Sequence, residues 1–541
     1  MLEVVRQGGT LKSECMPFTA IPHNSRLFLD FLFDFDKVAG FYGHPPRPQA
    51  VLDCARTLDF PAERRARVAD VLERQNRRWG ASEAAQASIE KFRHGAVACI
   101  SGQQVGLFGG PLYSILKAVS ALQMAEELSA QGVPAVPLFW LATEDHDWAE
   151  ISGVTLPSGC ELQKLSASAP LSDGPVGSLP LEPQIGELVE QAAAILGEGW
   201  VTEALRQSYR AGESYGSAFA RLFTRLMADT GLVLVDPLDD ELHAIVQPLF
   251  TAAAERAVEL DEALLERGVA LHKAGYHEQV RVTPESTLIF SMESGRRTVL
   301  HLAGDGFMLE AQRIPRAEML SRIAAHPGRF SANVLLRPVV QDYLFPTAVY
   351  FGGPAEIAYF AQAEVIYRKL LGRTTPVMHR LSATLVSQPM SQLMERYQLS
   401  FRDLFHGSER VCELLASRAL PSTLQAALRG ARCSLESWLT AVKGELSQLD
   451  PTLVDASARI ERKMMYQLQK IGGKAARAEL RRNKELVDDA HHVLTELFPN
   501  KELQERVLPG IYFLARYGPE LIDTLKQAAV PQCPGHQIIR L

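Results

Sequence analysis

Two short polar segments of the chain carry the residue types that could do chemistry. In residues 101–117 an apolar run ends in Ser-Gly-Gln-Gln and continues through further glycines into a helical pattern. Such glycines let the backbone turn tightly, so that N–H groups and a helix N-terminus can bind an anion or a polar small molecule. The spacing matches neither a Walker loop nor the dinucleotide fingerprint. A tight strand-to-helix turn with structural glycines is the alternative interpretation.

The second segment, residues 143–147, consists of Thr-Glu-Asp-His-Asp and directly follows an apolar run at residues 136–142. Ligands of open α/β sheets bind beyond the carboxyl ends of the strands, which is where this cluster is expected. Carboxylates crowded around an imidazole favour general acid–base catalysis, amine binding or a metal. A solvated acidic loop with Asp147 capping a helix is the alternative, and a single histidine is a weak basis for zinc.

Three further positions have the chemistry of a binding site. His277 precedes an expected strand, where a lone histidine is more often structural than catalytic. Arg337 could hold a carboxylate or phosphate through two parallel hydrogen bonds. Glu356 follows a Gly-Gly-Pro turn and either binds substrate or favours the dipole of the helix that begins there.

The catalytic candidates are therefore Asp145, His146 and Asp147. The binding candidates are Gly102, Gln103, Gln104, Gly106, Leu107, Gly109, Gly110, Pro111, Tyr113, Lys117, Glu144, His277, Arg337, Gln341, Asp342, Gly352, Gly353, Glu356 and Tyr359.

The elements around these residues predict an α/β fold. Strand patterns at 97–100 and 136–142 enclose a helical pattern at 116–128, which is a βαβ unit with a parallel pair and a right-handed crossover. Both polar segments follow strands of this unit, so they are expected to border one cleft. Residues 20–95 are expected to be mainly helical, and residues 232–237 to contain a short buried strand.

The remaining segments predict insertions and a helical arm. Residues 152–190 are rich in Gly, Pro and Ser and are expected to be a loop-rich insertion. Short strands at 279–282, 286–291, 298–302 and 306–310 predict a small antiparallel insertion. From residue 388 to 498 apolar residues recur every three or four positions on both sides of Gly472-Gly473, which predicts two long helices that meet there. Intramolecular packing and dimerisation are both compatible with this pattern.

Composition limits the classes of protein. A chain of 541 residues exceeds a single core, and 47% hydrophobic with 22% charged residues is typical of a globular protein. The net charge of −7 argues against a dedicated nucleic-acid binder, and no apolar run is long enough for a bilayer. The seven cysteines are scattered without a CxxC pair, so neither a disulfide framework nor a zinc ribbon is expected, and a reducing cytoplasm is the expected compartment.

These motifs, in this order, resemble the BshC family, the cysteine ligases of bacillithiol biosynthesis. The matching segments extend over nearly the whole chain, at residues 101–117, 140–147, 275–280, 337–342, 345–347, 352–359, 497–506 and 517–518. The resemblance implies a Rossmann-like core resembling class I aminoacyl-tRNA synthetases with two connecting insertions, plus a long α-helical coiled-coil arm. It divides the chain at 1–155 (helices and first half of the core), 156–230 (first insertion), 231–265 (core), 266–330 (β-rich second insertion), 331–387 (second half of the core), 388–498 (arm) and 499–541 (C-terminal helices).

The same resemblance implies a function. It indicates a ligase that adds cysteine to the amine of glucosaminyl-malate in the last step of bacillithiol biosynthesis, with ATP or ADP as candidate cofactor and no metal. The expected partners are these small molecules and a second copy of the chain, joined through the arm, with no nucleic acid and no membrane. A non-catalytic scaffold of thiol biosynthesis and a tRNA-synthetase-like enzyme are the alternatives. Residues 376–382 lack the lysines of a Lys-Met-Ser-Lys-Ser loop, which counts against synthetase-style adenylation.

Overall fold

The computed structural model describes residues 2–6, 9–169, 174–293, 296–450, 452–528 and 533–541. The chain divides into two compact units. Unit 1 consists of Met1–Leu156, Gln163–Thr384 and Glu505–Ile539, and unit 2 of Pro157–Leu162, Leu385–Gln504 and Arg540–Leu541. The finer division into seven segments stays a prediction.

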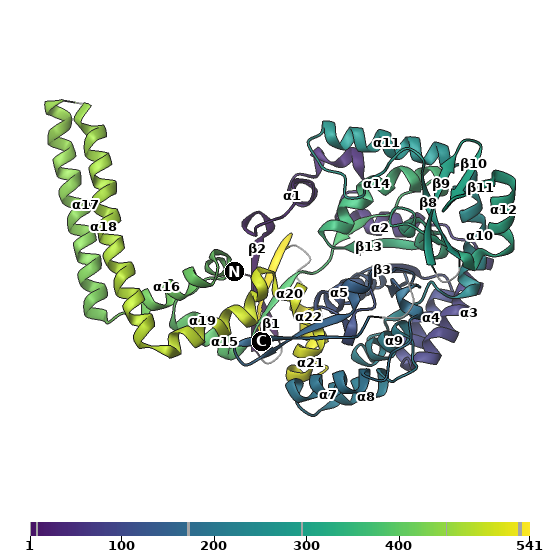
Figure 1. The fold of residues 1–541 in the computed structure, drawn as a ribbon, viewed down its shortest axis with the longest axis horizontal. Coiled ribbons are helices and arrows are strands. Elements are labelled where there is room, and N and C mark those ends of the chain that lie inside the picture. Colours follow the sequence, from purple (N-terminus) through teal and green to yellow (C-terminus); the bar gives the residue numbers. More distant parts are fainter. Residues whose placement is uncertain (1, 7–8, 170–173, 294–295, 451, 529–532) are drawn as a thin grey trace. The chain divides into compact units, whose positions relative to one another are not determined.

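Unit 1 contains a five-stranded parallel sheet with the order β14-β13-β3-β4-β7. Figure 1 labels two adjacent strands of it, β13 and β3. Its strands are β3 (Val97–Gln103), β4 (Ala135–Leu141), β7 (Val233–Val235), β13 (Thr347–Gly352) and β14 (Val377–His379). Numbered along the chain, the strands have the 3-2-1-4-5 arrangement of a doubly wound fold. β4 and β13 are buried along their whole length, which explains why both are continuous apolar runs. The strand order reverses between β3 and β13, and ligands of such sheets bind at that point.

Helices surround this sheet, and α5 (Tyr113–Ala130) forms the expected crossover from β3 to β4. The expected helices near the N-terminus are confirmed as α1 (Arg26–Phe33), α2 (Pro48–Thr57) and α3 (Ala62–Trp79), followed by α4 (Glu83–Arg93). The other helices outside the arm are α6 (Trp148–Ile151), α7 (Ile185–Leu196), α8 (Trp200–Ser208), α9 (Tyr215–Leu226), α10 (Asp240–Glu255), α11 (Ala257–Lys273), α12 (Arg316–Ala325), α13 (Arg337–Leu344), α14 (Pro354–Leu371), α20 (Gln504–Val507), α21 (Gly510–Tyr517) and α22 (Leu521–Ala528).

The expected antiparallel insertion is present as a sheet with the order β11-β10-β9-β8-β12. Its strands are β8 (Ser286–Glu293), β9 (Arg296–Ala303), β10 (Gly306–Leu309), β11 (Gln312–Pro315) and β12 (Phe330–Ala332). The prediction of a strand at 279–282 was wrong. The N–H groups of Gln279 and Val280 donate to the side-chain oxygen of Gln362 at 3.0 and 2.9 Å, so an α14 side chain holds this backbone in place of a neighbouring strand.

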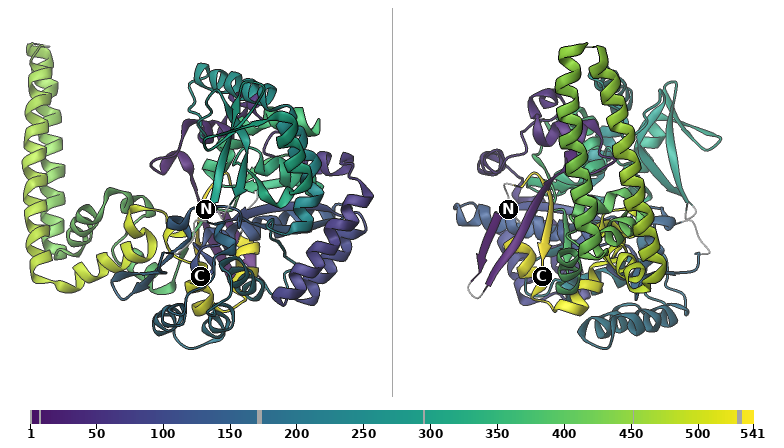
Figure 2. Two further views of the ribbon diagram at one scale, coloured as in Figure 1. Left: turned by 45° about the vertical axis from the view of Figure 1, so that its right-hand side comes forward. Right: turned by 90° about the vertical axis from the view of Figure 1, so that its left-hand side faces the viewer.

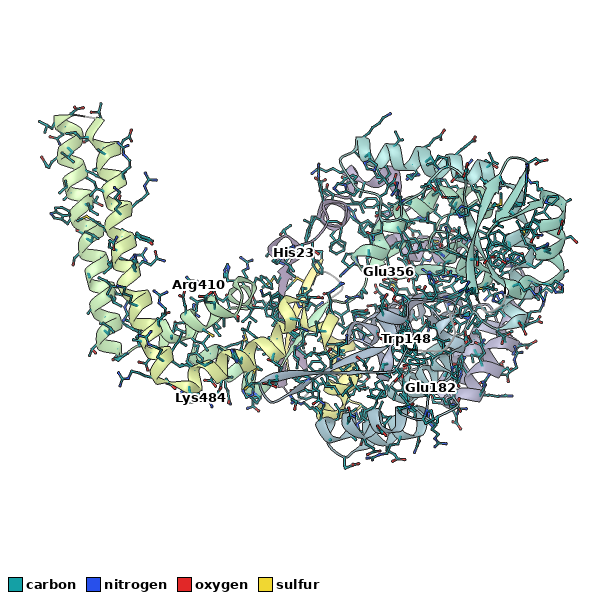
Figure 3. All side chains as sticks on the ribbon, viewed as in Figure 1. His23, Trp148, Glu182, Glu356, Arg410 and Lys484 are labelled. Atoms are coloured by element: carbon teal, nitrogen blue, oxygen red, sulfur yellow. A yellow bond between two sulfur atoms is a disulfide. The ribbon has the colours of Figure 1, made fainter. Side chains whose placement is uncertain are left out.

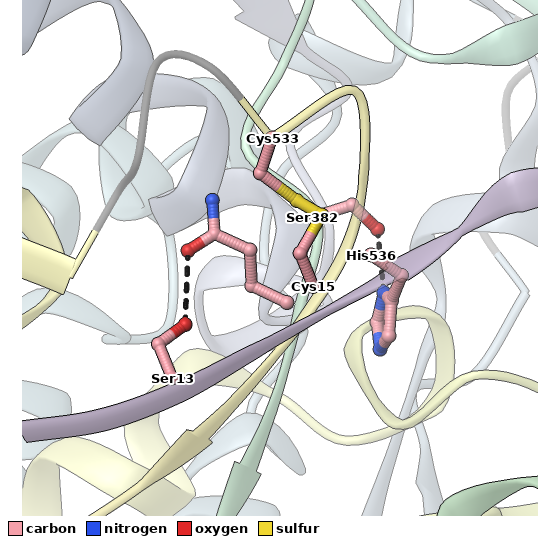
Figure 4. The surroundings of a disulfide bond; sticks show 6 residues. Ser13, Cys15, Ser382, Cys533 and His536 are labelled. Atoms are coloured by element: carbon pink, nitrogen blue, oxygen red, sulfur yellow. Dashed lines mark hydrogen bonds between the residues drawn. A yellow bond between two sulfur atoms is a disulfide. The ribbon is translucent and has the colours of Figure 1, made fainter. Parts of the chain in front are cut away.

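Residues 152–190, expected to be loop-rich, contain the two-stranded sheet of β5 (Gly153–Ser158) and β6 (Glu161–Ser166). A further sheet has the order β1-β2-β16-β15, with β1 (Leu2–Arg6), β2 (Gly9–Pro17), β15 (Ala383–Val386) and β16 (Gly535–Arg540). Beside the antiparallel β2–β16 pair a disulfide joins Cys15 to Cys533 (Figure 4), which the cysteine spacing did not indicate. The two cysteines are 518 positions apart, and only the pairing of β2 with β16 brings them together.

Unit 2 consists mainly of helices: α15 (Gln388–Arg396), α16 (Ser408–Ala419), α17 (Ser422–Leu449), α18 (Thr452–Arg482) and α19 (Lys484–Leu497). The long helices α17 and α18 lie side by side in every view (Figure 2), which confirms a helical hairpin. The predicted break at Gly472-Gly473 was wrong, because α18 continues through both glycines. A helical glycine costs about 1 kcal/mol relative to alanine, and the packing of α18 against α16 and α17 outweighs that cost.

Candidate functional site

A cavity of about 700 Å³ lies in unit 1, where residues that follow β3, β4 and β13 meet. Gly102, Gln103 and Gln104 line it from the end of β3, and Gly353 and Glu356 from the turn after β13. The cavity therefore includes the point at which the strand order reverses, as expected for a doubly wound sheet.

A buried ion pair joins the β3 and β13 sides of the cavity. The Lys117 ammonium lies 2.6 Å from the Glu356 carboxylate and donates to the Gly102 carbonyl at 2.7 Å. Glu356, labelled in Figure 3, also accepts from the Gly353 N–H at 2.7 Å and the Tyr350 hydroxyl at 2.5 Å. Burial lowers the pKa of Lys117 against the opposing effect of Glu356. Burial alone would raise the pKa of Glu356, but the ammonium and the two donors hold it below its usual value, which favours the carboxylate.

Arg337, at the start of α13, presents a guanidinium to the same cavity. It donates to the Tyr359 hydroxyl at 2.8 Å and to the Gln341 side-chain oxygen at 3.3 Å, with the Tyr350 hydroxyl at 3.5 Å. Among the described residues no carboxylate forms an ion pair with it, whereas Lys117 has Glu356. An arginine with neutral partners in a cavity is suited to a carboxylate or phosphate ligand.

The acidic segment after β4 lies against the loop after β3. The Gln104 side-chain N–H donates to Asp145 at 2.8 Å, which confirms that the two segments meet. The guanidinium of Arg297, from β9, lies 3.5 Å from Asp145 and 3.2 Å from His146 Nδ1. Within the described chain the Gln104 side-chain oxygen is buried without a partner. A buried acceptor without a partner costs about 1–3 kcal/mol, so a donor on a ligand or a water molecule is expected here.

Glu144 has a buried histidine as its partner. His243, on α10, lies 3.2 Å from the Glu144 carboxylate through Nε2, and its Nδ1 lies 3.2 Å from the Pro327 carbonyl. Burial would lower the pKa of His243, but the bond to Glu144 outweighs burial and raises it. His243 thus holds Glu144 in one orientation at the edge of the cavity. The sequence offered no signal for this histidine, because it lies inside an ordinary amphipathic helix.

Twelve of the predicted site residues line the cavity: Gly102, Gln103, Gln104, Tyr113, Lys117, Glu144, Asp145, His146, Arg337, Gly353, Glu356 and Tyr359. Ten do not: Gly106, Leu107, Gly109, Gly110, Pro111, Asp147, His277, Gln341, Asp342 and Gly352.

The glycine loop does not present its backbone to the cavity as expected. The N–H groups of Gly106, Gly109 and Gly110 donate to carbonyls of the loop itself, at 2.9, 3.2 and 3.1 Å. Leu107 is fully buried, and Gly110 has a φ of +68°, which a side chain would disfavour. The expectation that these N–H groups bind an anion was therefore wrong, and this part of the loop is a tight structural turn.

Three other candidates lie outside the cavity, and two of them have structural roles. The Asp147 side chain caps α6 by accepting from the Glu150 N–H at 3.2 Å, which is the alternative foreseen for it. His277 is exposed outside the cavity. Asp342 is buried, accepts from the Thr375 hydroxyl and has a pKa raised by burial, so it belongs to the packing beneath α13.

Sequence reasoning missed six charged residues of the cavity wall: Glu150, Asp261, Arg281, Arg297, Arg380 and Arg506. Glu150, Arg281 and Arg506 lie in or beside motif segments, and only the tertiary fold shows that these six side chains reach one cavity. In the described part of the chain no group of three or more His, Cys, Asp and Glu side chains is placed to hold a metal.

Strand order and cavity define a Rossmann-like protein with a helical hairpin domain, and comparisons with known proteins identify the family. Residues 11–381 match the family model "Bacillithiol biosynthesis BshC, N-terminal Rossmann-like domain", and residues 383–541 match "Bacillithiol biosynthesis BshC, C-terminal coiled-coil domain". The chain belongs to the BshC family.

Three relatives are each named "Putative cysteine ligase BshC". The chain is 44% identical to the protein from Koribacter versatilis over 98% of its own length and 99% of that protein. It is 38% identical to the one from Solibacter usitatus, over 97% and 99%, and 34% identical to the one from Salinibacter ruber, over 95% and 96%. In the residues that the structure describes, no helix is both long and apolar enough to span a membrane. The likeness to class I aminoacyl-tRNA synthetases stays a prediction.

Proposed function

We propose that this chain is a ligase that joins cysteine to the amine of glucosaminyl-malate, in the last step of bacillithiol biosynthesis. Full-length similarity to relatives named for cysteine ligation supports the class of reaction. One observation carries the substrate assignment: the cavity combines Arg337, which has neutral partners, with the acidic pair Glu144 and Asp145. A substrate with carboxylates and an amine is complementary to that combination.

Amide formation requires a neutral amine and an activated carboxyl group. In our proposal Arg337 holds a carboxylate of the malate moiety, with the Tyr359 hydroxyl fixing the guanidinium. Asp145 binds the ammonium group and accepts the proton that must leave before attack. Gln104 orients that carboxylate, and its free side-chain oxygen accepts from the amine or a sugar hydroxyl.

The carboxyl group of cysteine also needs activation, and ATP is the cofactor that we propose for this. The cationic side chains of the wall, Arg281, Arg297 and Arg380, are chemically suited to phosphate oxygens. ATP would supply a phosphate or nucleotide leaving group on the carboxyl.

The test compares two neighbouring aspartates. Asp145→Asn removes the proposed base, whereas Asp147→Asn changes an exposed cap outside the cavity, and asparagine caps helices about as well as aspartate. The purified chain is incubated with cysteine, glucosaminyl-malate and ATP, and thiol products are quantified by mass spectrometry. We expect product from the wild type and D147N and a large loss in D145N. Equal activity of D145N and wild type would contradict the assignment of the base.

A deletion strain tests the reaction itself. Loss of the protein should abolish bacillithiol and accumulate glucosaminyl-malate. Normal bacillithiol in a strain without a redundant enzyme would refute the ligase proposal, and the scaffold alternative would then be favoured.

We also propose that the chain forms a homodimer through α17 and α18. Large apolar side chains are exposed on this hairpin, including Trp438, Ile460, Tyr466 and Ile471, each more than half exposed. Exposed apolar groups at helical spacing favour a partner helix. Light scattering of the full chain should give a dimer that Ile460→Glu and Ile471→Glu together dissociate, and a monomeric wild type would refute the proposal.

A further inference from the structure

Unit 1 contains a second, smaller cavity next to the disulfide. Its volume is about 190 Å³, and its wall includes Cys533, Glu127, Arg380 and Ser382. One half of the disulfide, Cys533, lines this cavity, whereas Cys15 does not. Each water in the liquid takes about 30 Å³, so the space suits a molecule the size of one amino acid. Of the two disulfide cysteines in the described chain, only Cys533 therefore lies beside a space of this size.

The charges of the wall indicate which small molecule fits. Glu127 supplies a carboxylate on one part of the wall. Arg380 lies on another part, where its guanidinium already donates to Glu505 at 2.8 Å and to the Leu381 carbonyl at 2.7 Å. His379, also in the wall, is uncharged because burial lowers its pKa to about 3. The Glu127 carboxylate is complementary to the ammonium of an amino acid, whose carboxylate would share the Arg380 guanidinium with Glu505.

We propose that this cavity binds a zwitterionic aminothiol, which exchanges with the disulfide and forms a mixed disulfide on Cys533. The thiolate of the aminothiol attacks the Cys533 sulfur, a new S–S bond forms there, and the Cys15–Cys533 bond breaks. The electron pair of the broken bond stays on Cys15, which leaves as a thiolate and takes a proton from water. One disulfide is consumed and one is formed, so no external oxidant or reductant is needed.

A chain of hydrogen bonds connects the segment of Cys533 to the larger cavity. Three residues further along, the His536 ring nitrogen Nδ1 lies 2.8 Å from the Ser382 hydroxyl (Figure 4). The same hydroxyl donates to Glu505 at 2.8 Å, and Glu505 binds Arg380 at 2.8 Å. Arg380 lines both cavities. If the proposed exchange occurs, we expect release of the bond to Cys15 to loosen the segment that holds Arg380 at the larger cavity. This inference is independent of the proposed function.

The experiment uses the full, oxidised chain in a Cys433→Ser background, because Cys433 is the exposed free cysteine among the described residues. The protein is treated with free cysteine, quenched with an alkylating agent and mapped by peptide mass spectrometry. We expect a cysteine adduct on Cys533 and alkylation of Cys15. At equal thiolate concentration, cysteine should react several-fold faster than 2-mercaptoethanol, which lacks both charges, and than glutathione, which is larger.

Two variants separate recognition from simple exposure. Glu127 has one hydrogen bond, from Gln131 at 3.5 Å on the helix surface, so Glu127→Gln should fold normally. It should slow the reaction with cysteine and leave that with 2-mercaptoethanol unchanged. Cys15→Ser removes the disulfide, so the adduct from reduced cysteine should disappear, and amide hydrogen exchange in β14 and β15 should rise.

Four results would overturn the proposal. Alkylation of both Cys15 and Cys533 in the untreated oxidised chain would show that the disulfide does not form. An adduct on Cys15, or equal rates for the three thiols, would contradict recognition at Cys533. Unchanged hydrogen exchange in Cys15→Ser would refute the link to Arg380.

Discussion

Removing the charge of Glu356 tests whether the Lys117 pair determines the stability of the sheet edge. The Gly353 N–H and the Tyr350 hydroxyl donate to different oxygens of the Glu356 carboxylate. Glu356→Gln keeps one of these oxygens, and its amide N–H can donate to the Tyr350 oxygen instead, so the main loss is the charge. Lys117, its side chain 4% exposed, then has only neutral partners and must either stay buried as an unpaired cation or lose its proton. Breaking one partner of a buried pair costs about 3–5 kcal/mol.

A second argument limits the size of this effect. The buried lysine can avoid an unpaired charge by releasing its proton. A lysine in the unfolded chain titrates near 10.4, so releasing the proton at pH 7 costs about 5 kcal/mol, and the loss of stability cannot exceed that value. Burial already lowers the pKa of Lys117, and loss of Glu356 lowers it further. The unfolded chain then binds the proton more tightly than the folded chain, so the stability deficit of E356Q should shrink as the pH rises from 7 towards 10.

Urea unfolding monitored by circular dichroism at pH 7 and pH 10 measures both effects. The double variant Lys117→Met with Glu356→Gln should be more stable than either single variant, because it leaves no buried charge without a partner. Glu259→Gln is the control: its carboxylate pairs with Arg256 and Lys369, each at 2.8 Å, on the surface, where solvent screens the charges, and a much smaller loss of stability is expected. If E356Q and E259Q behave alike, or if the deficit does not depend on pH, the reasoning is refuted.

Three further predictions concern stability. Burial lowers the pKa of His536 to about 4, below the value near 6.5 of the unfolded chain. Unfolding between these values takes up a proton, so about 3 kcal/mol of stability should be lost as the pH falls from 6.5 to 4. His536→Gln should flatten that slope in a pH series of urea titrations. Gly102→Ala should destabilise the protein by about 1–3 kcal/mol in thermal melts, because the added carbon would lie 2.7 Å from the Trp140 carbonyl, whereas Gly186→Ala, with open space around it, should not. Asp147→Ala should cost about 1 kcal/mol through loss of the α6 cap, and an unchanged melting temperature would contradict the capping role.

The sequence predicted the central fold because local patterns there agree with the tertiary structure. Apolar runs before residues 101 and 143 form buried parallel strands, and the helix between them is the crossover. The polar residues that follow such strands must share one edge of the sheet, and the contact between Gln104 and Asp145 confirms this. The chemistry of an arginine and the Gly-Gly-Pro turn extended the prediction to Arg337 and Glu356, which line the same cavity.

Local patterns could not decide contacts between distant segments. Gly472-Gly473 would favour a break in an isolated helix, but packing against neighbouring helices carries α18 through it. His243, Arg297 and Cys533 acquire their roles from partners more than ninety positions away: Glu144, Asp145 and Cys15.

The sequence by itself therefore determined which polar segments follow the central strands, because side-chain periodicity and turn chemistry act over a few residues. The tertiary structure decided which charges face one another, which glycine N–H groups are already occupied, and which sulfur lines the small cavity. Those properties depend on burial and on distances between segments that sequence proximity does not encode.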